Sequence, residues 1–429
     1  MKEVKVFKNI LSFKANLSIV ILIVIVTLIV GCIPKPSETP PEGNQEGVSP
    51  FHLATRITSR VTEKQIEFVN KHFEFVMTPV LSSEMREKVK GPVLFLYRSI
   101  QGTWTDFDHF DWSHIDANEN MFCHNSSPDN PYPNNRIKTI WNSWLMDGGD
   151  LVDKDDPDAL NHWVNYYAVT ASKQVHEFDY DGLFIDSAGH KLSKGAVRGL
   201  MPDDYSDEKW RDDRYKALKF IKSYLPDKIV VFNGLHSGNG AEKSLEFTDG
   251  GMWETFIFNP NTGNYFGEKK WEEVINLVER NKDGKKISLV VKKKGITENL
   301  KDRLFAMTSY LLVSSENVSF TLVDLNYDKL NSIFYYPEYE LNLGLPVGEF
   351  EDQRGIYKRE FENAVIFVNP GKSKSYTIAL DEVYKKVIPS GGGPVSEDGT
   401  YSGKIRYETV SGEIKLPPKS GIILLKQND

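Results

Sequence analysis

The chain has 429 residues, of which 40% are hydrophobic and 26% are charged, so it is long and apolar enough to bury a large globular core. Its formal net charge of −8, from 52 Lys and Arg against 60 Asp and Glu, argues against a nucleic-acid partner held by phosphate contacts. With two cysteines, Cys32 and Cys123, the chain cannot form a disulfide-rich scaffold or a four-cysteine zinc site.

The N-terminal segment has the layout of a secretory signal, with lysines followed by an apolar run from Leu17 to Val30. The run ends in Ile-Val-Gly-Cys, which resembles the lipobox of bacterial lipoproteins, so residues 1–31 are predicted to be a signal peptide and Cys32 the lipidated residue. An uncleaved anchor helix is the alternative, because the run is only slightly shorter than a membrane span. Either reading predicts attachment to the cell membrane with the chain on the extracytoplasmic face, because the lysines favour the cytoplasmic side.

Residues 32–50 are rich in Pro, Gly and Glu and contain few large apolar side chains. A segment of this composition cannot form a core, so it is predicted to be a tether between the membrane and the folded protein. Cys123 then has no partner in the chain, and we expect it to be a free, buried thiol.

From residue 51 onward, short β-branched or aromatic runs alternate with longer segments of helical period. Eight strands are predicted, at His52–Thr58, Phe73–Pro79, Pro92–Ser99, Asp181–Ser187, Lys228–Gly234, Gly251–Phe256, Ile287–Lys292 and Val318–Val323. Helices are predicted between them, most clearly at Glu63–Lys71, Ala159–His176, Asp207–Tyr224, Lys270–Arg280 and Asn299–Val313. This α/β rhythm predicts a (β/α)8 TIM barrel over residues 51–350. A doubly wound open sheet is the alternative, but no glycine-rich phosphate loop follows the first strand.

Residues 351–429 contain strand signals without helices, separated by Gly, Pro and Ser. The predicted strands are Gly355–Phe361, Ala364–Asn369, Ser375–Leu380, Gly403–Thr409 and Gly421–Lys426. This spacing predicts a small all-β domain, an antiparallel sandwich, after the barrel.

Two acids lie where a barrel of this kind carries its catalytic residues, at the carboxyl ends of strands. Asp186 ends the fourth predicted strand, and Glu254 lies near the end of the sixth, beside Trp253. Two carboxylates facing each other across a barrel mouth are what glycoside cleavage needs, one to protonate the leaving oxygen and one to attack the sugar or activate water. A single acid at a strand end is more often a solvated residue or a structural cap. Two such acids on strands four and six, with a Trp beside one of them, favour a catalytic pair.

Other polar and aromatic residues near the predicted strand ends, or in the long insertion before the fourth strand, are candidates for substrate binding. They are Tyr97, Trp144, Asp147, Asn233, His236, Trp253, Lys292 and Asp324. Aromatic faces pack against sugar rings, and amides and carboxylates hydrogen-bond sugar hydroxyls, although some of these aromatics are expected to fill the core. The nine histidines show no ligand spacing, so no metal site is predicted.

The segment Asp179–Ser187, DYDGLFIDS, resembles the Asp-Gly-[Val/Leu]-Phe-[Leu/Ile]-Asp signature of glycoside-hydrolase-like barrels. With Trp144–Asp147 before it, the chain is similar to the hypothetical glycosyl hydrolase family fifteen, a provisional family distinct from the glucoamylases. The resemblance implies a catalytic (β/α)8 barrel that acts on carbohydrate without an organic cofactor. In barrel clans that resemble α-galactosidases, the strand-four acid is the nucleophile and the strand-six acid the acid/base. Carried over, these roles fall to Asp186 and Glu254.

The sequence therefore predicts a membrane-tethered extracellular glycoside hydrolase with two catalytic carboxylates, retaining by analogy. A non-catalytic, carbohydrate-binding surface lipoprotein on a degenerate barrel is the alternative.

Overall fold

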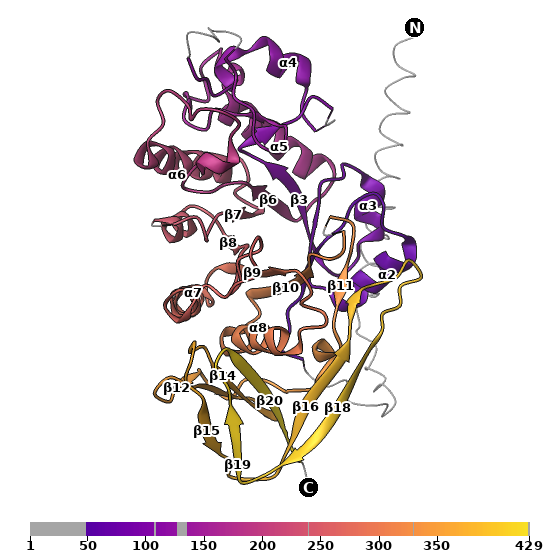
Figure 1. Cartoon of the computed structure of the whole chain (residues 1–429). Helices are drawn as coiled ribbons and strands as arrows, with labels where there is room; N and C mark the ends of the chain where they lie inside the picture. Colours follow the sequence, from indigo (N-terminus) through magenta and orange to yellow (C-terminus); the bar gives the residue numbers. More distant parts are fainter. Residues whose placement is uncertain (1–48, 107–108, 127–134, 239, 329, 428–429) are drawn as a thin grey trace, which may run out of the picture. The chain divides into compact units, whose positions relative to one another are not determined.

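Eight parallel strands form the central sheet of the protein (Figure 1). The computed structural model describes residues 49–106, 109–126, 135–238, 240–328 and 330–427, so the predicted signal peptide, Cys32 and the tether up to residue 48 lie outside it. In sheet order the strands are β1 (Ala54–Arg56), β2 (Phe75–Thr78), β3 (Val93–Ser99), β6 (Gly182–Asp186), β7 (Ile229–Asn233), β8 (Gly250–Trp253), β9 (Lys286–Lys293) and β10 (Val318–Asp324). Each predicted strand is present, with its ends shifted by a few residues.

The sheet curls into a nearly closed barrel. Neighbouring strands pair in parallel from β1 to β10, and the first and last strands approach each other at a single parallel bridge between Leu53 and Phe320. The amide of Phe320 donates to the carbonyl of His52 at 2.8 Å, and the hydroxyl of Thr321 donates to the carbonyl of Ala54 at 2.7 Å. The predicted parallel α/β barrel is therefore confirmed, although its last seam is held by few hydrogen bonds.

Helices connect most of the barrel strands. They are α2 (Glu63–His72), α3 (Ser83–Lys88), α5 (Trp163–Glu177), α6 (Asp207–Ser223), α7 (Glu268–Asn281) and α8 (Leu300–Val313). The βα alternation is less regular than the sequence predicts, because the described residues between β7 and β8 form only a 3₁₀ helix, Ala241–Glu246. Among the described helices, none is long and apolar enough to cross a membrane.

The barrel interior has an apolar layer to which seven strands each contribute one side chain: Ala54, Phe75, Phe95, Phe184, Val231, Met252 and Val290. Because successive side chains of a strand alternate between its two faces, the residue two positions later on each strand also faces inward. Gly182 leaves room for this layer, since a Cβ there would lie 2.9 Å from the Phe95 ring and 2.1 Å from the carbonyl oxygen of Ile229.

A long insertion between β3 and α5 lies at the carboxyl ends of the strands (Figure 1). It contains the short antiparallel pair β4 (Gly102–Thr103) and β5 (Trp144–Leu145), together with helix α4 (Trp112–Ala117). Cys123 belongs to this insertion and is a buried free thiol, as predicted.

Antiparallel sheets follow the barrel. A six-stranded sheet has the order β12 (Glu351–Asp352), β13 (Tyr357–Glu360), β14 (Ala364–Asn369), β20 (Ser420–Lys426), β16 (Tyr384–Gly391) and β18 (Gly403–Val410). Separate two-stranded sheets pair β15 (Tyr376–Ala379) with β19 (Glu413–Leu416) and β11 (Phe334–Tyr335) with β17 (Gly393–Pro394). The strands β16 and β19 were not predicted, because lysines, glutamates and a proline interrupt their apolar pattern.

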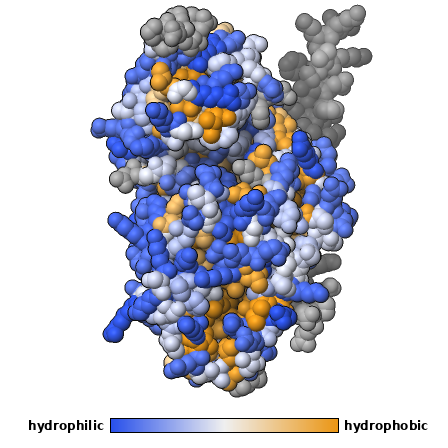
Figure 2. Space-filling model, in the orientation of Figure 1, coloured by the Kyte–Doolittle hydropathy of each residue, from blue (hydrophilic) through white to orange (hydrophobic). Residues whose placement is uncertain are grey.

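The strand β14 is buried on both faces. Its Ile366 and Val368 belong to the same apolar core as the barrel helices, whereas Val365 and Phe367 belong to a second cluster with residues of β15 and β19. Helix α8 thus packs between the barrel and the C-terminal sheets. The predicted division of the chain into two domains near residue 350 stays a prediction. Figure 2 shows a mostly hydrophilic face on which apolar side chains gather over these sheets.

Candidate active site

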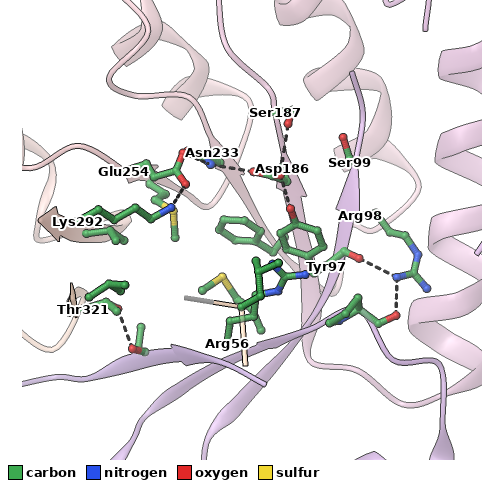
Figure 3. Close-up of a pocket in the computed structure, with 18 of the residues that line it drawn as sticks. Arg56, Tyr97, Arg98, Ser99, Asp186, Ser187, Asn233, Glu254, Lys292 and Thr321 are labelled. Atoms are coloured by element: carbon green, nitrogen blue, oxygen red, sulfur yellow. Dashed lines mark hydrogen bonds and ion pairs between the residues drawn. The ribbon is translucent and has the colours of Figure 1, made fainter. Parts of the chain in front are cut away.

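Polar side chains form a ring above the apolar layer of the barrel. Each member follows an inward-facing core residue by two positions, which places it at the carboxyl end of its strand and directs it into the barrel mouth (Figure 3). The ring consists of Arg56, Tyr97, Asp186, Asn233, Glu254 and Lys292. These residues line a pocket of about 660 Å³ that is also bounded by the insertion.

The side-chain amide of Asn233 connects the two candidate catalytic acids. Its Nδ2 donates to Asp186 Oδ1 at 2.8 Å and to Glu254 Oε2 at 3.0 Å. The orientation of the amide follows from this contact, since both neighbours are acceptors. The two distances sum to 5.8 Å, which is the largest separation that these two oxygens can have.

Glu254 also forms an ion pair with Lys292 of the next strand. Burial would raise the pKa of Glu254, but the charge and hydrogen bond of Lys292, with the hydrogen bond from Asn233, outweigh it and lower the pKa from 4.5 to about 2. Glu254 is therefore ionised at neutral pH in the free protein.

Asp186 is held by donors on both oxygens. The hydroxyl of Tyr97 donates to Oδ2, and that of Ser187 lies 3.3 Å from the same atom. Burial first, and then the charge of Asp186, raise the pKa of Tyr97 well above 10, so the phenol keeps its proton and remains a donor. Ser187 adopts a φ of 57°, a left-handed conformation that is rare for residues other than glycine and turns the chain directly after the carboxylate.

His236 completes the central part of the pocket. Burial lowers its pKa below the usual 6.5, which favours the neutral ring. Its Nδ1 is buried and has no hydrogen-bond partner among the residues that the structure describes, and the same holds for Asn233 Oδ1.

Of the predicted substrate-binding residues, the structure brings Tyr97, Asn233, His236 and Lys292 together with Asp186 and Glu254. It places the others outside the pocket: Trp144, Asp147, Trp253 and Asp324.

The alternation of strand residues explains two of these four exceptions. Met252 and Glu254 face the interior, so Trp253 between them faces outward, where it is 2% exposed and lies under the ammonium of Lys270 at 4.6 Å. Asp324, three positions after Thr321 of the pocket wall, is also turned outward and accepts the backbone N–H groups of Gly295, Thr297 and Asn326 at 2.8 to 3.0 Å. It holds a loop in place, and the structure does not support a substrate-binding role for either residue.

The other two exceptions belong to the insertion. Trp144 stacks on Trp112 with ring centroids 6.5 Å apart and lies under Lys138, so it holds the insertion together. Asp147 borders a separate small cavity with Cys123, where burial raises its pKa. Neither is available to a ligand in the barrel mouth.

Several pocket residues were not among the predicted site residues, and Arg56 and Trp141 are the two that bear on ligand binding. Arg56 ends β1 and stands two positions after the inward-facing Ala54, a signal that becomes visible only once the inward face of each strand is known. Trp141 is 59% exposed at the pocket rim, whereas the neighbouring aromatic Trp144 is partly buried. Within the described part of the chain, no group of three or more His, Cys, Asp or Glu side chains could hold a metal ion.

A family model described as hypothetical glycosyl hydrolase family 15 matches residues 108–365, more than half of the 429 residues. No curated protein matches the chain.

The solved structures that match the chain include several glycoside hydrolases. The glycoside hydrolase domain of PelA from Pseudomonas aeruginosa is 14% identical, with a TM-score of 0.41, and the match covers 64% of this chain and 94% of that one. The noncanonic maltogenic α-amylase AmyB from Thermotoga neapolitana is 11% identical, with a TM-score of 0.46 and coverages of 87% and 98%. Amy13B from Eubacterium rectale is 9% identical, with a TM-score of 0.45 and coverages of 92% and 100%.

Proposed function

Because the chain belongs to the hypothetical glycosyl hydrolase family 15, we propose that it is a retaining glycoside hydrolase whose catalytic carboxylates are Asp186 and Glu254. The observation that carries the proposal is the shared amide of Asn233, which limits the nearest oxygens of the two acids to 5.8 Å. Retaining enzymes keep their carboxyl groups about 5–5.5 Å apart, whereas inverting enzymes need about 6.5–9.5 Å to admit a water molecule.

In the proposed reaction, Asp186 attacks the anomeric carbon while Glu254 gives a proton to the departing glycosidic oxygen. The carbon–oxygen bond to the leaving sugar breaks, and an ester forms between the sugar and Asp186. Glu254 then takes a proton from water, whose oxygen attacks the anomeric carbon and releases Asp186. The donors Tyr97 and Asn233 keep the Asp186 carboxylate oriented and stabilise its charge.

The ion pair with Lys292 favours a second assignment of the same two roles. A pKa of about 2 makes Glu254 an anion in the free protein, which suits a nucleophile better than an acid. With Glu254 as the acid, substrate binding has to weaken its contact with Lys292 before the leaving oxygen can be protonated.

A screen for reducing ends released from polysaccharides provides the substrate for the decisive test. The variants Asp186→Asn and Glu254→Gln are expected to lose at least about 10²-fold in turnover. Asp181→Asn is the matched control, since Asp181 immediately precedes the same strand at the opposite end of the barrel and pairs with Arg86 there. Wild-type turnover in both pocket variants contradicts the proposal, and glycan binding without any release of reducing ends supports the non-catalytic alternative.

Rescue with azide separates the two roles, using small side chains at the same positions and an aryl glycoside of the identified sugar. Asp186→Gly with azide is expected to give a glycosyl azide of inverted anomeric configuration, because azide replaces the nucleophile. Glu254→Ala with azide is expected to give the retained configuration, because the ester on Asp186 still forms first. The reverse pattern of products assigns the roles the other way round.

We also propose that the enzyme is tethered at the extracytoplasmic face of the membrane through Cys32, with carbohydrate as its substrate. This part rests on the sequence of residues 1–32. Incorporation of labelled fatty acid into the wild type but not into Cys32→Ser tests the lipid, and an uncleaved anchor helix predicts no labelling of either protein.

A further inference from the structure

Arg56 is a cation in the pocket, and none of the described residues supplies it with an anionic partner. Its guanidinium takes part in no hydrogen bond or ion pair with the residues that the structure describes, and its Nε is buried. Lys292 is paired with Glu254, and Lys191, also at the pocket, is paired with Asp207 at 2.6 Å. Arg98 has no carboxylate partner among the described residues either, but it is 1% exposed and donates to the side chain of Gln174 and to the carbonyls of Pro79 and Tyr97. The charge of Arg56 is therefore left for a group that the protein itself does not supply.

The position of Arg56 is fixed by an aromatic ring. Its guanidinium carbon lies 4.5 Å from the centroid of the Tyr97 ring, and the hydroxyl of Tyr97 donates to Asp186 (Figure 3). One ring thus separates the cation from the proposed nucleophile. Arg56 and Asp186 line the same pocket, so we infer that a sugar with its anomeric carbon at Asp186 can direct a substituent toward Arg56.

A structural role limited to stacking does not account for the buried Nε. Buried polar groups in proteins are almost always hydrogen-bonded, so the unpaired Nε is a cost that the fold itself does not offset. The terminal nitrogens of Arg56 are not among the buried unpaired atoms, and Arg56 lines the pocket, so these nitrogens are the ones that a ligand can contact. Guanidinium groups bind carboxylates through two parallel hydrogen bonds, and stacking on Tyr97 orients the group before the ligand arrives.

The ring carries two cations, Arg56 and Lys292, and two carboxylates, so what favours an acidic group is the local place of Arg56 rather than the net charge of the pocket. Glu254 is neutralised by Lys292, and Asp186 is held by the neutral donors Tyr97 and Asn233. A second carboxylate on the substrate would be repelled by Asp186 if it lay beside it, but on Arg56 it lies on the far side of the Tyr97 ring.

From these observations we propose that the sugar bound next to Asp186 is a uronic acid, whose carboxylate pairs with Arg56. This inference rests on the proposed function and specifies its substrate class. It predicts that removal of the negative charge from the sugar weakens binding, and that the same charge becomes irrelevant once Arg56 is replaced.

The test measures binding by calorimetry in the Asp186→Asn background, which is expected not to cleave. The probes are oligosaccharides of galacturonic, glucuronic, mannuronic and guluronic acid, each compared with its carboxyl-reduced form, in which the same linkage carries a neutral sugar. At least one acidic probe is expected to bind about tenfold or more tightly than its reduced form, as for a charge-assisted hydrogen-bonded pair. Arg56→Gln is expected to bring that ratio close to one, and Arg56→Lys to retain part of it.

Arg60→Gln is the control, because Arg60 is exposed four residues further along and does not line the pocket. Equal binding of acidic and reduced probes, or of none of them, overturns the inference. An equal loss of affinity for the acidic and the carboxyl-reduced probes in Arg56→Gln also overturns it, because that result indicates that Arg56 only supports Tyr97. Preference for sulfated over carboxylated glycans likewise overturns the uronic acid assignment.

The two proposals fail in different ways. If the wild type cleaves a neutral glycan and Arg56→Gln cleaves it equally well, the proposed hydrolase activity stands and the uronic acid proposal is wrong. If acidic probes bind through Arg56 but the wild type cleaves none of them, the acidic ligand stands and the proposed hydrolase activity is wrong.

Discussion

Lys292 pairs its ammonium with the carboxylate of Glu254, and the two residues come from neighbouring barrel strands. This pair decides the protonation of the acid, because burial alone would raise the pKa of Glu254 and the pairing lowers it to about 2. The acid–base behaviour of the site therefore depends on a cation as much as on the two carboxylates.

Replacing Lys292 by Met is expected to move the pH optimum of kcat/KM upward. The lowering influence of the ammonium disappears while burial remains, so the pKa of Glu254 rises and its protonated form, which acts as the acid, persists to a higher pH. The measurement is a pH–rate profile with the substrate found in the screen. Lys292→Arg keeps the positive charge and should retain a profile close to that of the wild type. If Lys292→Met lowers kcat without any shift along the pH axis, the ion pair does not set the pKa of Glu254.

Replacing Asn233 by Ala is expected to lower kcat/KM by about 10- to 100-fold, the effect of losing hydrogen bonds to charged groups. The variant removes the donor that Asp186 and Glu254 share. Asn369 of β14 serves as the control, since its buried amide donates to three backbone carbonyls and neither it nor its partners line the pocket. Asn369→Ala should lower the melting temperature while the folded fraction keeps its kcat/KM. A similar kinetic effect in both variants would contradict a special role of Asn233.

The sequence was informative about the barrel because each strand is a short apolar run between polar segments. Asp186 and Glu254 could be found in the same way, since both follow such a run directly. What the pattern could not supply was the direction of each side chain. Trp253 and Glu254 are adjacent in the sequence, yet one enters the core and the other the pocket, because the inward face is set by the register of β8.

Long-range packing accounts for the other differences. Asp324 ends a strand, as a site residue would, but its carboxylate accepts three backbone N–H groups of nearby loops and so has a structural role. Strand β16 was missed because its residues Lys385, Lys386 and Pro389 do not alternate, and it is formed by pairing with β18 and β20. Such partners are distant in the chain and leave no local pattern.

Trp141 and Trp144, two of the four tryptophans of the insertion, are expected to differ in their effect on substrate binding. Trp141 is exposed at the rim of the pocket, whereas Trp144 stacks within the insertion and does not line the pocket. Trp141→Ala should therefore raise KM by about three- to tenfold with little change in kcat, as for the loss of one aromatic contact to the sugar. Trp144→Ala should lower stability and leave KM unchanged. Equal effects on KM would show that the rim aromatic does not contact the substrate.

The ion pair between Arg303 and Glu338 connects the barrel to the C-terminal sheets. Both side chains are fully buried, and Arg303 of α8 also donates to the carbonyls of Thr297 and Gly391 at 2.7 Å, the latter at the end of β16. Glu338→Gln leaves a buried guanidinium without its counter-charge, so it should lower the free energy of unfolding by about 3–5 kcal/mol. Urea unfolding followed by fluorescence and circular dichroism measures the change.

The double variant Arg303→Met with Glu338→Leu supplies the comparison. It removes both charges and fills their space with apolar groups, so it should recover much of the stability that Glu338→Gln loses. The charge-removal explanation predicts this recovery because the penalty of the single variant comes from the unpaired cation rather than from lost attraction. If the double variant is as unstable as the single one, the contacts of Arg303 to the two carbonyls, and not its pairing with Glu338, hold α8 against the C-terminal sheets.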